Sequence, residues 1–291
     1  EIIIVDDGST DNTSDIVKRF PVRYIYQSNK GPASARNSGA KEAKSEIILF
    51  TDSDCAPSQN WIEEMVKPFY DPAVTAVKGA YKTNQKGLTA RFAQIEFEER
   101  FEMLKKVESI DMIDTYSAAY RKLVFISLGG FDPSFPVANN EDTDLSYKMS
   151  RSGYKMVFNP DAIVYHLNHP DSVKRYARLK FWRGYWRMLV YKRYPDKMLK
   201  DTYTPQTLKL QILFLFIFLT CLPFSWFMPN LLFYPAILCL ILFILSTLPF
   251  IRLALKRDLI VALLSPFFLS VRAVSLGTGT LWAILSQKKL K

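Results

Sequence analysis

The stretches Ile2-Ile-Ile-Val-Asp-Asp-Gly-Ser9 and Glu46-Ile-Ile-Leu-Phe-Thr-Asp-Ser-Asp54 decide the fold. Each begins with a short apolar run and ends abruptly on carboxylates. A short apolar run that stops at turn residues is typical of a buried strand. The two runs therefore predict strands over residues 2–5 and 46–51, each with acidic residues at its carboxyl end.

The segments around these strands alternate between strand and helix patterns. Such alternation implies an α/β domain with a mostly parallel sheet. Ligands of such sheets bind beyond the carboxyl ends of the strands, which is where the acids lie. The remaining elements expected here are helices over 14–20, 32–44, 58–70 and 88–107, and strands over 22–26 and 73–80.

Two acidic pairs follow predicted strands. Asp6 and Asp7 lie in a D-D-G-S turn and can accept hydrogen bonds from a nucleotide base or ribose; an ordinary Asp-Gly turn that caps the next helix explains them equally well. Asp52 and Asp54 can hold a hard divalent cation, since Mg²⁺ takes one or two carboxylates together with substrate phosphates. The alternative for the second pair is a solvated acidic loop.

A loop precedes the predicted helix over 32–44 and reads Asn-Lys-Gly-Pro-Ala-Ser-Ala-Arg-Asn-Ser-Gly over residues 29–39. Helix N-termini attract phosphate, and Arg36 can pair with a phosphate bidentately, so Gly31 and Arg36 are candidates for donor binding. A capped surface helix whose small residues pack on the sheet is the alternative.

A third acidic segment, Asn-Asn-Glu-Asp-Thr-Asp-Leu over 139–145, opens a predicted helix that ends near Gly153. The helix dipole favours acids in a first turn, which is sufficient to explain them. The functional interpretation is that one of the three carboxylates, Glu141, Asp142 or Asp144, is a general base held by a rigid helix start. The Gly-Gly-Phe-Asp turn over 129–132 would shape the wall beside it.

His166 follows a strand-like run over 162–165 and is one of two histidines in the chain. Its place at a strand end makes it a candidate third metal ligand or phosphate contact. A structural histidine is the alternative.

Taken in chain order, these motifs resemble those of the family 2 glycosyltransferases, which have the nucleotide-sugar-binding GT-A fold. The resemblance covers roughly residues 1–170 and rests on D-D-G-S, N-x-G-x-x-x-A-R-N-x-G, D-x-D, G-G-F-D, E-D-x-D-L and a strand-end histidine. It implies a GT-A catalytic domain over residues 1–171, followed by an α-helical membrane region.

The resemblance also implies roles for the matching positions. Asp7 would contact the nucleotide base, with Asp6 beside it, while Gly31 and Arg36 would lie near the donor. The remaining roles concern the metal and the acceptor: Asp52 and Asp54 would hold Mg²⁺ or Mn²⁺ against the diphosphate, His166 would join them, and Asp142 would be the catalytic base, with Glu141 next to it.

This similarity predicts an inverting transferase that moves a sugar from a nucleotide-sugar donor to an acceptor hydroxyl in one displacement. Processive synthases of the family carry Q-x-x-R-W after the E-D segment, and the corresponding stretch over 178–186, Arg-Leu-Lys-Phe-Trp-Arg-Gly-Tyr-Trp, lacks it. Addition of one or a few sugars, in polysaccharide or glycolipid synthesis, is therefore expected. Because the chain begins in mid-strand, the catalytic domain is expected to be truncated at its N-terminus.

Charge separates the chain into two parts. Residues 1–171 contain 20 Lys and Arg against 25 Asp and Glu, whereas residues 172–291 contain 18 against 3. No charged residue occurs in the 42 residues from Leu210 to Ile251, and a span needs about 20 apolar residues. Two transmembrane helices are therefore predicted over 208–251, near 208–227 and 231–251. The three cysteines show neither disulfide nor zinc spacing.

Residues 252–291 are apolar again but contain Arg272 in mid-segment and a tail with Lys288, Lys289 and Lys291. Eleven basic residues against two acidic ones over 172–209 place that side in the cytoplasm. Two spans return the chain to the same side, so an interfacial or re-entrant apolar segment with a basic tail is expected here.

The segment 172–207 mixes basic and aromatic residues. Such a mixture can bind nucleic acid, but two spans follow at once, so an interfacial helix on anionic lipid is the simpler interpretation. We therefore expect a lipid bilayer, and no nucleic acid, as the partner of this connector. An active site held near the membrane further favours a lipid-linked glycan acceptor.

Four other functions compete with this one. A polyprenyl-phosphate glycosyltransferase would also have terminal spans, but the E-D-x-D-L segment favours a hydroxyl acceptor. A non-catalytic nucleotide-binding module of a membrane complex is disfavoured because every expected acid is present. An oxidoreductase and a transporter are disfavoured because no G-x-G-x-x-G follows a strand and the predicted spans contain no acidic residue.

Overall fold

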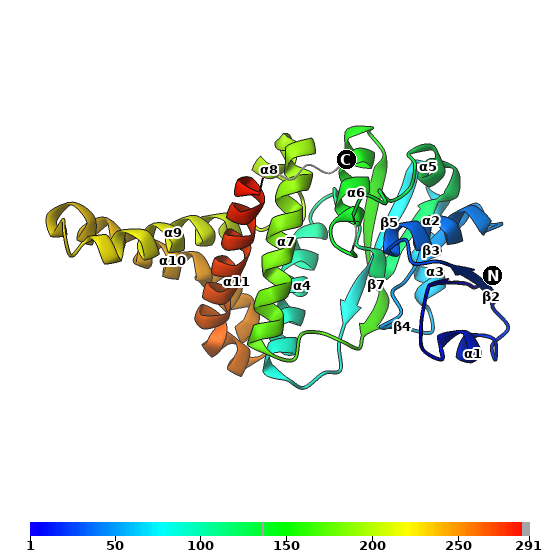
Figure 1. The fold of residues 1–291 in the computed structure, drawn as a ribbon, viewed down its shortest axis with the longest axis horizontal. Helices are drawn as coiled ribbons and strands as arrows, with labels where there is room; N and C mark the ends of the chain where they lie inside the picture. Colours follow the sequence, from blue (N-terminus) through cyan, green and yellow to red (C-terminus); the bar gives the residue numbers. More distant parts are fainter. Residues whose placement is uncertain (136, 287–291) are drawn as a thin grey trace. The chain divides into compact units, whose positions relative to one another are not determined.

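The computed structural model describes residues 1–135 and 137–286 and divides into two compact units (Figure 1). Among the described residues, unit 1 comprises residues 1–81 and 107–165, apart from residue 136, and unit 2 comprises residues 82–106 and 166–286. The long helix expected over 88–107 lies in the second unit up to residue 106. The basic tail formed by Lys288, Lys289 and Lys291 lies outside the described residues.

Unit 1 contains strands and short helices. A parallel two-stranded sheet joins β1 (Ile3–Asp7) to β2 (Arg23–Gln27), and a five-stranded sheet has the order β3-β6-β5-β7-β4. The strands of the larger sheet are β3 (Ile47–Phe50), β4 (Cys55–Pro57), β5 (Val74–Lys82), β6 (Ala118–Arg121) and β7 (Lys155–His166). The helices are α1 (Thr13–Val17), α2 (Pro32–Glu42), α3 (Trp61–Val66), α5 (Lys122–Ser127) and α6 (Glu141–Arg151).

The larger sheet is mixed, whereas the alternating pattern predicted a mostly parallel one. Strand β6 runs antiparallel to both β3 and β5, with Phe50 opposite Ala118 and Ala119 between Leu49 and Val77. This strand has four residues, of which Ala118, Ala119 and Tyr120 are all buried, so it shows no alternation of buried and exposed positions. Strands β4 and β6 were therefore not among the predicted elements.

Aromatic rings form the core beside the end of β3. Phe50 lies 5.4 Å from both Phe125 and Phe131, measured between ring centroids, and Tyr120 lies 5.9 Å from Phe50. Tyr120, Phe125 and Phe131 are fully buried. Burying each such ring stabilises the fold by about 2 kcal/mol. This cluster fixes the end of β3 against the Gly-Gly-Phe-Asp turn, so two predicted motifs share one core.

Unit 2 is helical. Its long helices are α4 (Leu88–Leu104), α7 (Val173–Arg193), α9 (Gln206–Phe224), α10 (Pro229–Leu255) and α11 (Leu259–Leu285), with the short α8 (Pro195–Leu199) between them. Among the described residues, α9, α10 and α11 are long and apolar enough to cross a membrane. The first two match the predicted spans. The third is one unbroken helix where an interfacial or re-entrant segment was expected.

Helices α7 and α11 lie side by side and run in the same direction (Figure 1). A Cβ at Gly184 would lie 2.3 Å from the carbonyl oxygen of Leu276, and one at Gly279 would lie 2.0 Å from that of Phe181. Only glycine permits so close an approach of two helix backbones. The two glycines thus set the spacing of this helix pair.

A buried ion cluster explains the arginine in the middle of α11. Glu96 of α4 accepts from Lys180 at 2.8 Å and from Arg272 at 3.1 Å, and Tyr176 donates to it at 2.9 Å. Gln211 of α9 accepts from Arg272 at 2.7 Å. Burial alone would raise the pKa of Glu96, but Lys180 and Arg272 outweigh burial and lower it. The charge of Arg272 is therefore matched inside the protein and does not face lipid.

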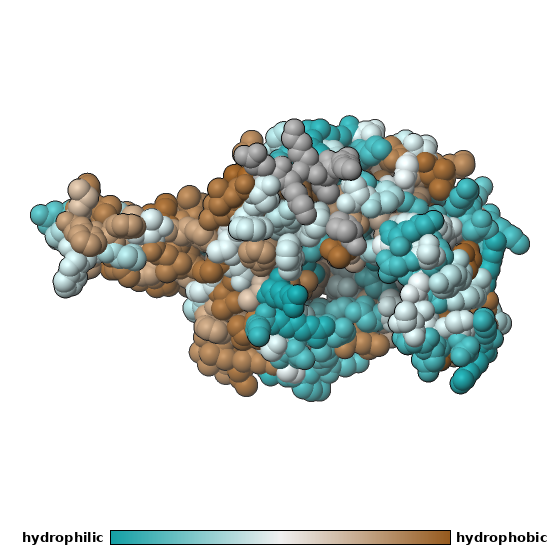
Figure 2. Space-filling model, viewed as in Figure 1, coloured by the Kyte–Doolittle hydropathy of each residue, from teal (hydrophilic) through white to brown (hydrophobic). Residues whose placement is uncertain are grey.

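Hydrophobic side chains cover much of the α9–α10 hairpin, which projects from the rest of unit 2 (Figures 1 and 2). Trp226, Phe227 and Tyr234 near its turn are 88%, 79% and 71% exposed. Aromatic rings of this kind are enriched at membrane interfaces. The hairpin therefore has the surface of a membrane-inserted pair of helices.

We expect Gly279→Ala to lower the thermal unfolding midpoint of the protein in detergent. The added methyl group would collide with the carbonyl oxygen of Phe181 and push α11 away from α7. Overpacking of this kind costs about 1–3 kcal/mol. Gly87→Ala is the matched control, since no atom lies within 4 Å of its Cβ position and its φ of −59° suits alanine. Equal midpoints for the two variants would contradict this packing.

Candidate active site

The D-x-D motif lies in the turn between β3 and β4. The amide of Cys55 donates to the carbonyl oxygen of Asp52 at 3.0 Å and closes this turn. The side chain of Asp52 accepts from Arg36 at 2.8 Å and from Thr115 at 3.4 Å. Asp52 is thus held by helix α2 on one side and by the segment before β6 on the other.

Arg36 connects the D-x-D turn to the E-D turn. Its Nη2 donates to Asp52, and its Nη1 donates to Glu141 at 2.7 Å. Burial disfavours the charged guanidinium, but Asp52 and Glu141 outweigh burial and raise the pKa of Arg36, with a further contribution from Asp142. Arg36 therefore contacts both Asp52 and Glu141, and all three are predicted site residues. The role of Arg36 in donor binding stays a prediction.

Glu141 and Asp142, two of the three acids in the first turn of α6, have different surroundings. Asn140 adopts a left-handed conformation, with φ of 68°, which asparagine tolerates better than most residues. Glu141 is 2% exposed, and its second oxygen accepts from the amide of Asn139 at 2.7 Å. Burial raises the pKa of Glu141, and Arg36 opposes that rise. Asp142 is half-buried and accepts from the amide of Thr143 at 2.7 Å.

Asn37 directly follows Arg36 and was not a predicted site residue. It anchors the Gly-Gly-Phe-Asp turn. Its side-chain amide donates to the carbonyl oxygen of Phe131 at 2.7 Å and accepts from the Phe131 amide at 2.9 Å. Gly130 has φ of +67°, and a Cβ there would lie 2.4 Å from the Asn37 oxygen. The adjacent glycines and the Arg-Asn pair were the sequence signals for this contact.

The first acidic pair organises its own loops. Asp6 is 4% exposed and accepts from the Ser9 amide at 2.8 Å and from the Tyr24 hydroxyl at 2.6 Å. The hydrogen bond from Tyr24 is the main reason why the pKa of Asp6 is lowered. Asp7 accepts from the amides of Lys30 and Gly31 at 2.9 and 2.8 Å. Both carboxylates therefore shape the loops beside α2, and their contact with a donor stays a prediction.

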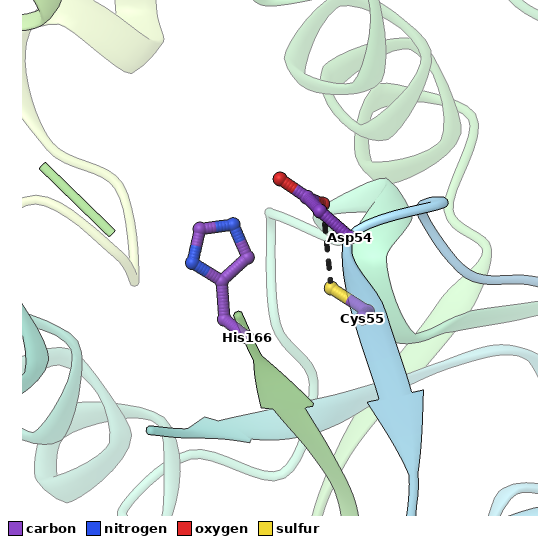
Figure 3. A group of neighbouring side chains, drawn as sticks. All are labelled: Asp54, Cys55 and His166. Atoms are coloured by element: carbon purple, nitrogen blue, oxygen red, sulfur yellow. Dashed lines mark hydrogen bonds between the residues drawn. The ribbon is translucent and has the colours of Figure 1, made fainter. Parts of the chain in front are cut away.

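Asp54, Cys55 and His166 form a group that could hold a metal ion. Their ligand atoms all lie within 4.8 Å of one another, and Figure 3 shows the imidazole of His166 beside the carboxylate of Asp54. Cys55 begins β4 and His166 ends β7, which are neighbours in the sheet, and Asp54 directly precedes β4. The group contains the predicted Asp54 and His166, whereas Asp52 is engaged by Arg36.

Cys55 was not predicted to belong to this group, although it directly follows the D-x-D motif. Burial, followed by the charges of Asp52 and Asp54, raises the pKa of its thiol to about 12. A bound cation would itself favour the thiolate, which is the form that binds metals, so Cys55 can serve as a third donor. The other two donors are a carboxylate and an imidazole, and a divalent cation such as Mg²⁺ or Mn²⁺ would complete its shell with further oxygen ligands.

His169 is a further histidine that the sequence did not single out. Its Nδ1 lies 3.1 Å from Nδ1 of His166, and the two ring centroids are 4.4 Å apart. Burial, with a smaller contribution from His166, lowers the pKa of His169 to about 3, so its imidazole is neutral. The His-Leu-Asn-His spacing over 166–169 was the only available signal.

Comparisons with known proteins bear on this site. Residues 1–129 match the profile of the family described as Glycosyl transferase family 2. A pre-mycofactocin glycosyltransferase of Mycobacterium tuberculosis is 25% identical over 206 residues, which cover 67% of this chain and 43% of the relative. A poly-beta-1,6-N-acetyl-D-glucosamine synthase of Staphylococcus aureus is 27% identical over 178 residues, which cover 57% of this chain and 42% of the relative. The chain thus spans less than half the length of these two curated relatives.

Among solved structures, a mannosyltransferase of Pyrobaculum calidifontis in complex with GDP-Man and Mn²⁺ superposes with a TM-score of 0.60 and 17% identity. The match covers 99% of this chain and 79% of that one. The GT-A fold and the resemblance to family 2 glycosyltransferases are thereby confirmed.

We expect Arg36→Ala to destabilise the protein by about 2–3 kcal/mol, because Glu141 would keep a buried carboxylate without its cation. The Arg36→Ala, Glu141→Gln double variant should recover part of this loss. Arg23→Ala is the matched control: its ion pair with Glu42 is nearly half exposed on both sides, and such a pair contributes at most about 1 kcal/mol. Thermal unfolding midpoints in detergent provide the measurement, and equal losses for Arg36→Ala and Arg23→Ala would contradict the expected role.

Proposed function

Starting from the family 2 glycosyltransferase profile in residues 1–129, we propose that this chain transfers a sugar from a nucleotide-sugar donor to a hydroxyl of a membrane-proximal acceptor, with inversion at the anomeric carbon. The observation that supports this most is the double ion pair of Arg36. Arg36 pairs with Asp52 of the D-x-D turn and with Glu141 of the E-D turn, which is 105 residues further along the chain than Arg36, and this supports a donor side and an acceptor side that lie close together.

Asp142 is the proposed general base. Of the three acids in the first turn of α6 it is the most exposed, because Asp144 is buried and Glu141 is buried and paired with Arg36. An ionised Asp142 would take the proton of the acceptor hydroxyl as the hydroxyl oxygen attacks the anomeric carbon. The bond from that carbon to the nucleotide diphosphate breaks in the same displacement. Glu141 and Arg36 would keep Asp142 in place.

Asp54 and His166 would hold the divalent cation, either Mg²⁺ or Mn²⁺. When bound, the cation supplies positive charge against the diphosphate. Asp52 would act on the donor side from its place beside Arg36. The loop of Gly31, fixed by Asp7, leads into the N-terminus of α2, where backbone amides favour phosphate.

The acceptor is proposed to be a lipid-linked glycan, with the catalytic unit on the cytoplasmic side. The apolar α9–α10 hairpin and the basic, aromatic α7 support membrane attachment. Two other functions remain as outcomes of experiment: a polyprenyl-phosphate transferase, whose acceptor needs no strong base, and a non-catalytic nucleotide-binding module.

The first test is nucleotide release by the full chain in nanodiscs from a panel of UDP-, GDP- and dTDP-sugars, with Mn²⁺ or Mg²⁺ and a lipid extract as acceptor. We expect release from one donor, reduced about 100-fold or more in Asp142→Asn and in Asp54→Ala. Release that Asp142→Asn leaves unchanged would favour the phosphate acceptor. Nucleotide binding without any release would favour the non-catalytic module.

A second test compares one glycan acceptor in water-soluble and lipid-linked form at equal concentration. We expect faster transfer to the lipid-linked form, because the membrane concentrates that acceptor near the anchored catalytic unit. Equal rates on the two forms would count against a lipid-linked acceptor while leaving transferase activity intact. Empty nanodiscs mixed with the soluble acceptor serve as the control for nonspecific effects of lipid.

A further inference from the structure

A series of polar contacts within unit 2 links Glu98 to His166. Gln94 Nε2 lies 3.4 Å from Glu98 Oε1, and Gln94 Oε1 lies 3.4 Å from His169 Nε2. His169 Nδ1 in turn lies 3.1 Å from His166 Nδ1. His169 is 2% exposed and Gln94 is 9% exposed, so protein atoms surround the middle of this series of contacts.

The direction of each hydrogen bond in this series follows from Glu98, where the series begins. The carboxylate of Glu98, which pairs with Arg257 at 3.1 Å, can only accept, so the NH₂ group of Gln94 must face it. The Gln94 oxygen then faces His169 and requires a proton on His169 Nε2. A neutral imidazole bears one proton, so His169 Nδ1 is an acceptor.

The last step concerns His166. An acceptor at His169 Nδ1 requires His166 to donate from its own Nδ1. A neutral His166 in that tautomer has its lone pair on Nε2, and in Figure 3 this nitrogen points toward Asp54 while Nδ1 points away. A metal-binding histidine commonly donates its other ring N–H to a partner that fixes its tautomer.

We propose that His169, oriented by Gln94 and Glu98, is a positioning residue that holds His166 in the tautomer whose Nε2 can bind a divalent cation. This inference rests on the metal site of the proposed function. The backbone of His169 is fixed as well, because its amide donates to the Gln85 side chain at 2.7 Å and its carbonyl oxygen accepts from that side chain at 3.3 Å. Ring and backbone are therefore both constrained.

A purely packing role for His169 is the competing explanation. Its ring also stacks on Phe97, with centroids 5.9 Å apart, so a substitution could act by loosening that contact. His169→Phe separates the two roles, because an aromatic ring remains while the acceptor is lost. His169→Gln does the opposite, because its side-chain oxygen can still accept from His166 Nδ1 while the ring is lost.

The tautomer can be read directly, because the sequence contains two histidines. The 291-residue chain labelled with [¹⁵N]histidine, with any affinity tag removed, gives four ring nitrogen signals, and His169→Gln assigns them. We expect a protonated Nδ1 on His166 and a protonated Nε2 on His169 without metal. A protonated Nε2 on His166 would overturn the proposal.

The consequence for the metal is measured by Mn²⁺ titration, with free Mn²⁺ followed by electron paramagnetic resonance. We expect His169→Phe to raise the Kd by about 10-fold and His169→Gln to raise it less. The effect should vanish in a His166→Ala background. A normal Kd for His169→Phe, or an effect that persists without His166, would overturn the proposal.

The outcomes separate this inference from the proposed function. Wild-type binding that Asp54→Ala removes and His169→Phe leaves unchanged would overturn the role of His169 and leave the transferase intact. Absence of any Mn²⁺ binding by the wild type, together with metal-independent nucleotide release, would overturn the metal site and this inference but not the transfer reaction.

Discussion

The candidate site depends on one guanidinium group. Arg36 holds Asp52 and Glu141, which belong to turns far apart in the sequence and are both acidic. Without a cation between them, their like charges would drive these turns apart or force protonation. The arginine is well suited to this task, because its planar fork meets two carboxylates at once and its charge is permanent. Pairing the buried Glu141 with Arg36 also leaves the neighbouring Asp142 as the acid that solvent can reach.

The sequence predicted the parts of the structure that local patterns determine. Apolar runs ending on acids predicted β1 and β3 to within two residues, and Gly153, with φ of +77°, ends the α6 region as expected. The uncharged run predicted the α9–α10 hairpin, with its turn at the residues before Pro229. Each of these signals is a spacing or a composition within a few residues. The family resemblance then assigned chemistry to positions that spacing alone left open.

Pairings between distant segments could not be predicted in this way. Strand β6 is four residues long, and its place between β3 and β5 is set by burial on all sides and not by any alternation of its own. Arg272 pointed to an interrupted segment because a charge in an apolar run is costly in lipid, yet Glu96, 176 residues away, compensates it. His169 likewise acquires its interest only through Gln94. Partners of buried polar groups are a tertiary property, which a one-dimensional pattern does not contain.

The packing of α11 on α7 bears on how α11 meets the membrane. Along its length α11 packs on α7, and α7 exposes Lys174, Arg175, Arg178 and Lys192. If α11 crossed the bilayer, α7 would have to accompany it, and the charges along α7 would be brought into or beside the hydrocarbon region, where lysine and arginine are costly. With both helices along the interface, the charges of α7 meet lipid head groups, while Leu263, Phe267, Trp282 and Leu285 of α11 face the acyl chains. The physical balance therefore favours an interfacial α11 beside a two-helix anchor, even though its length and composition would suffice for a span.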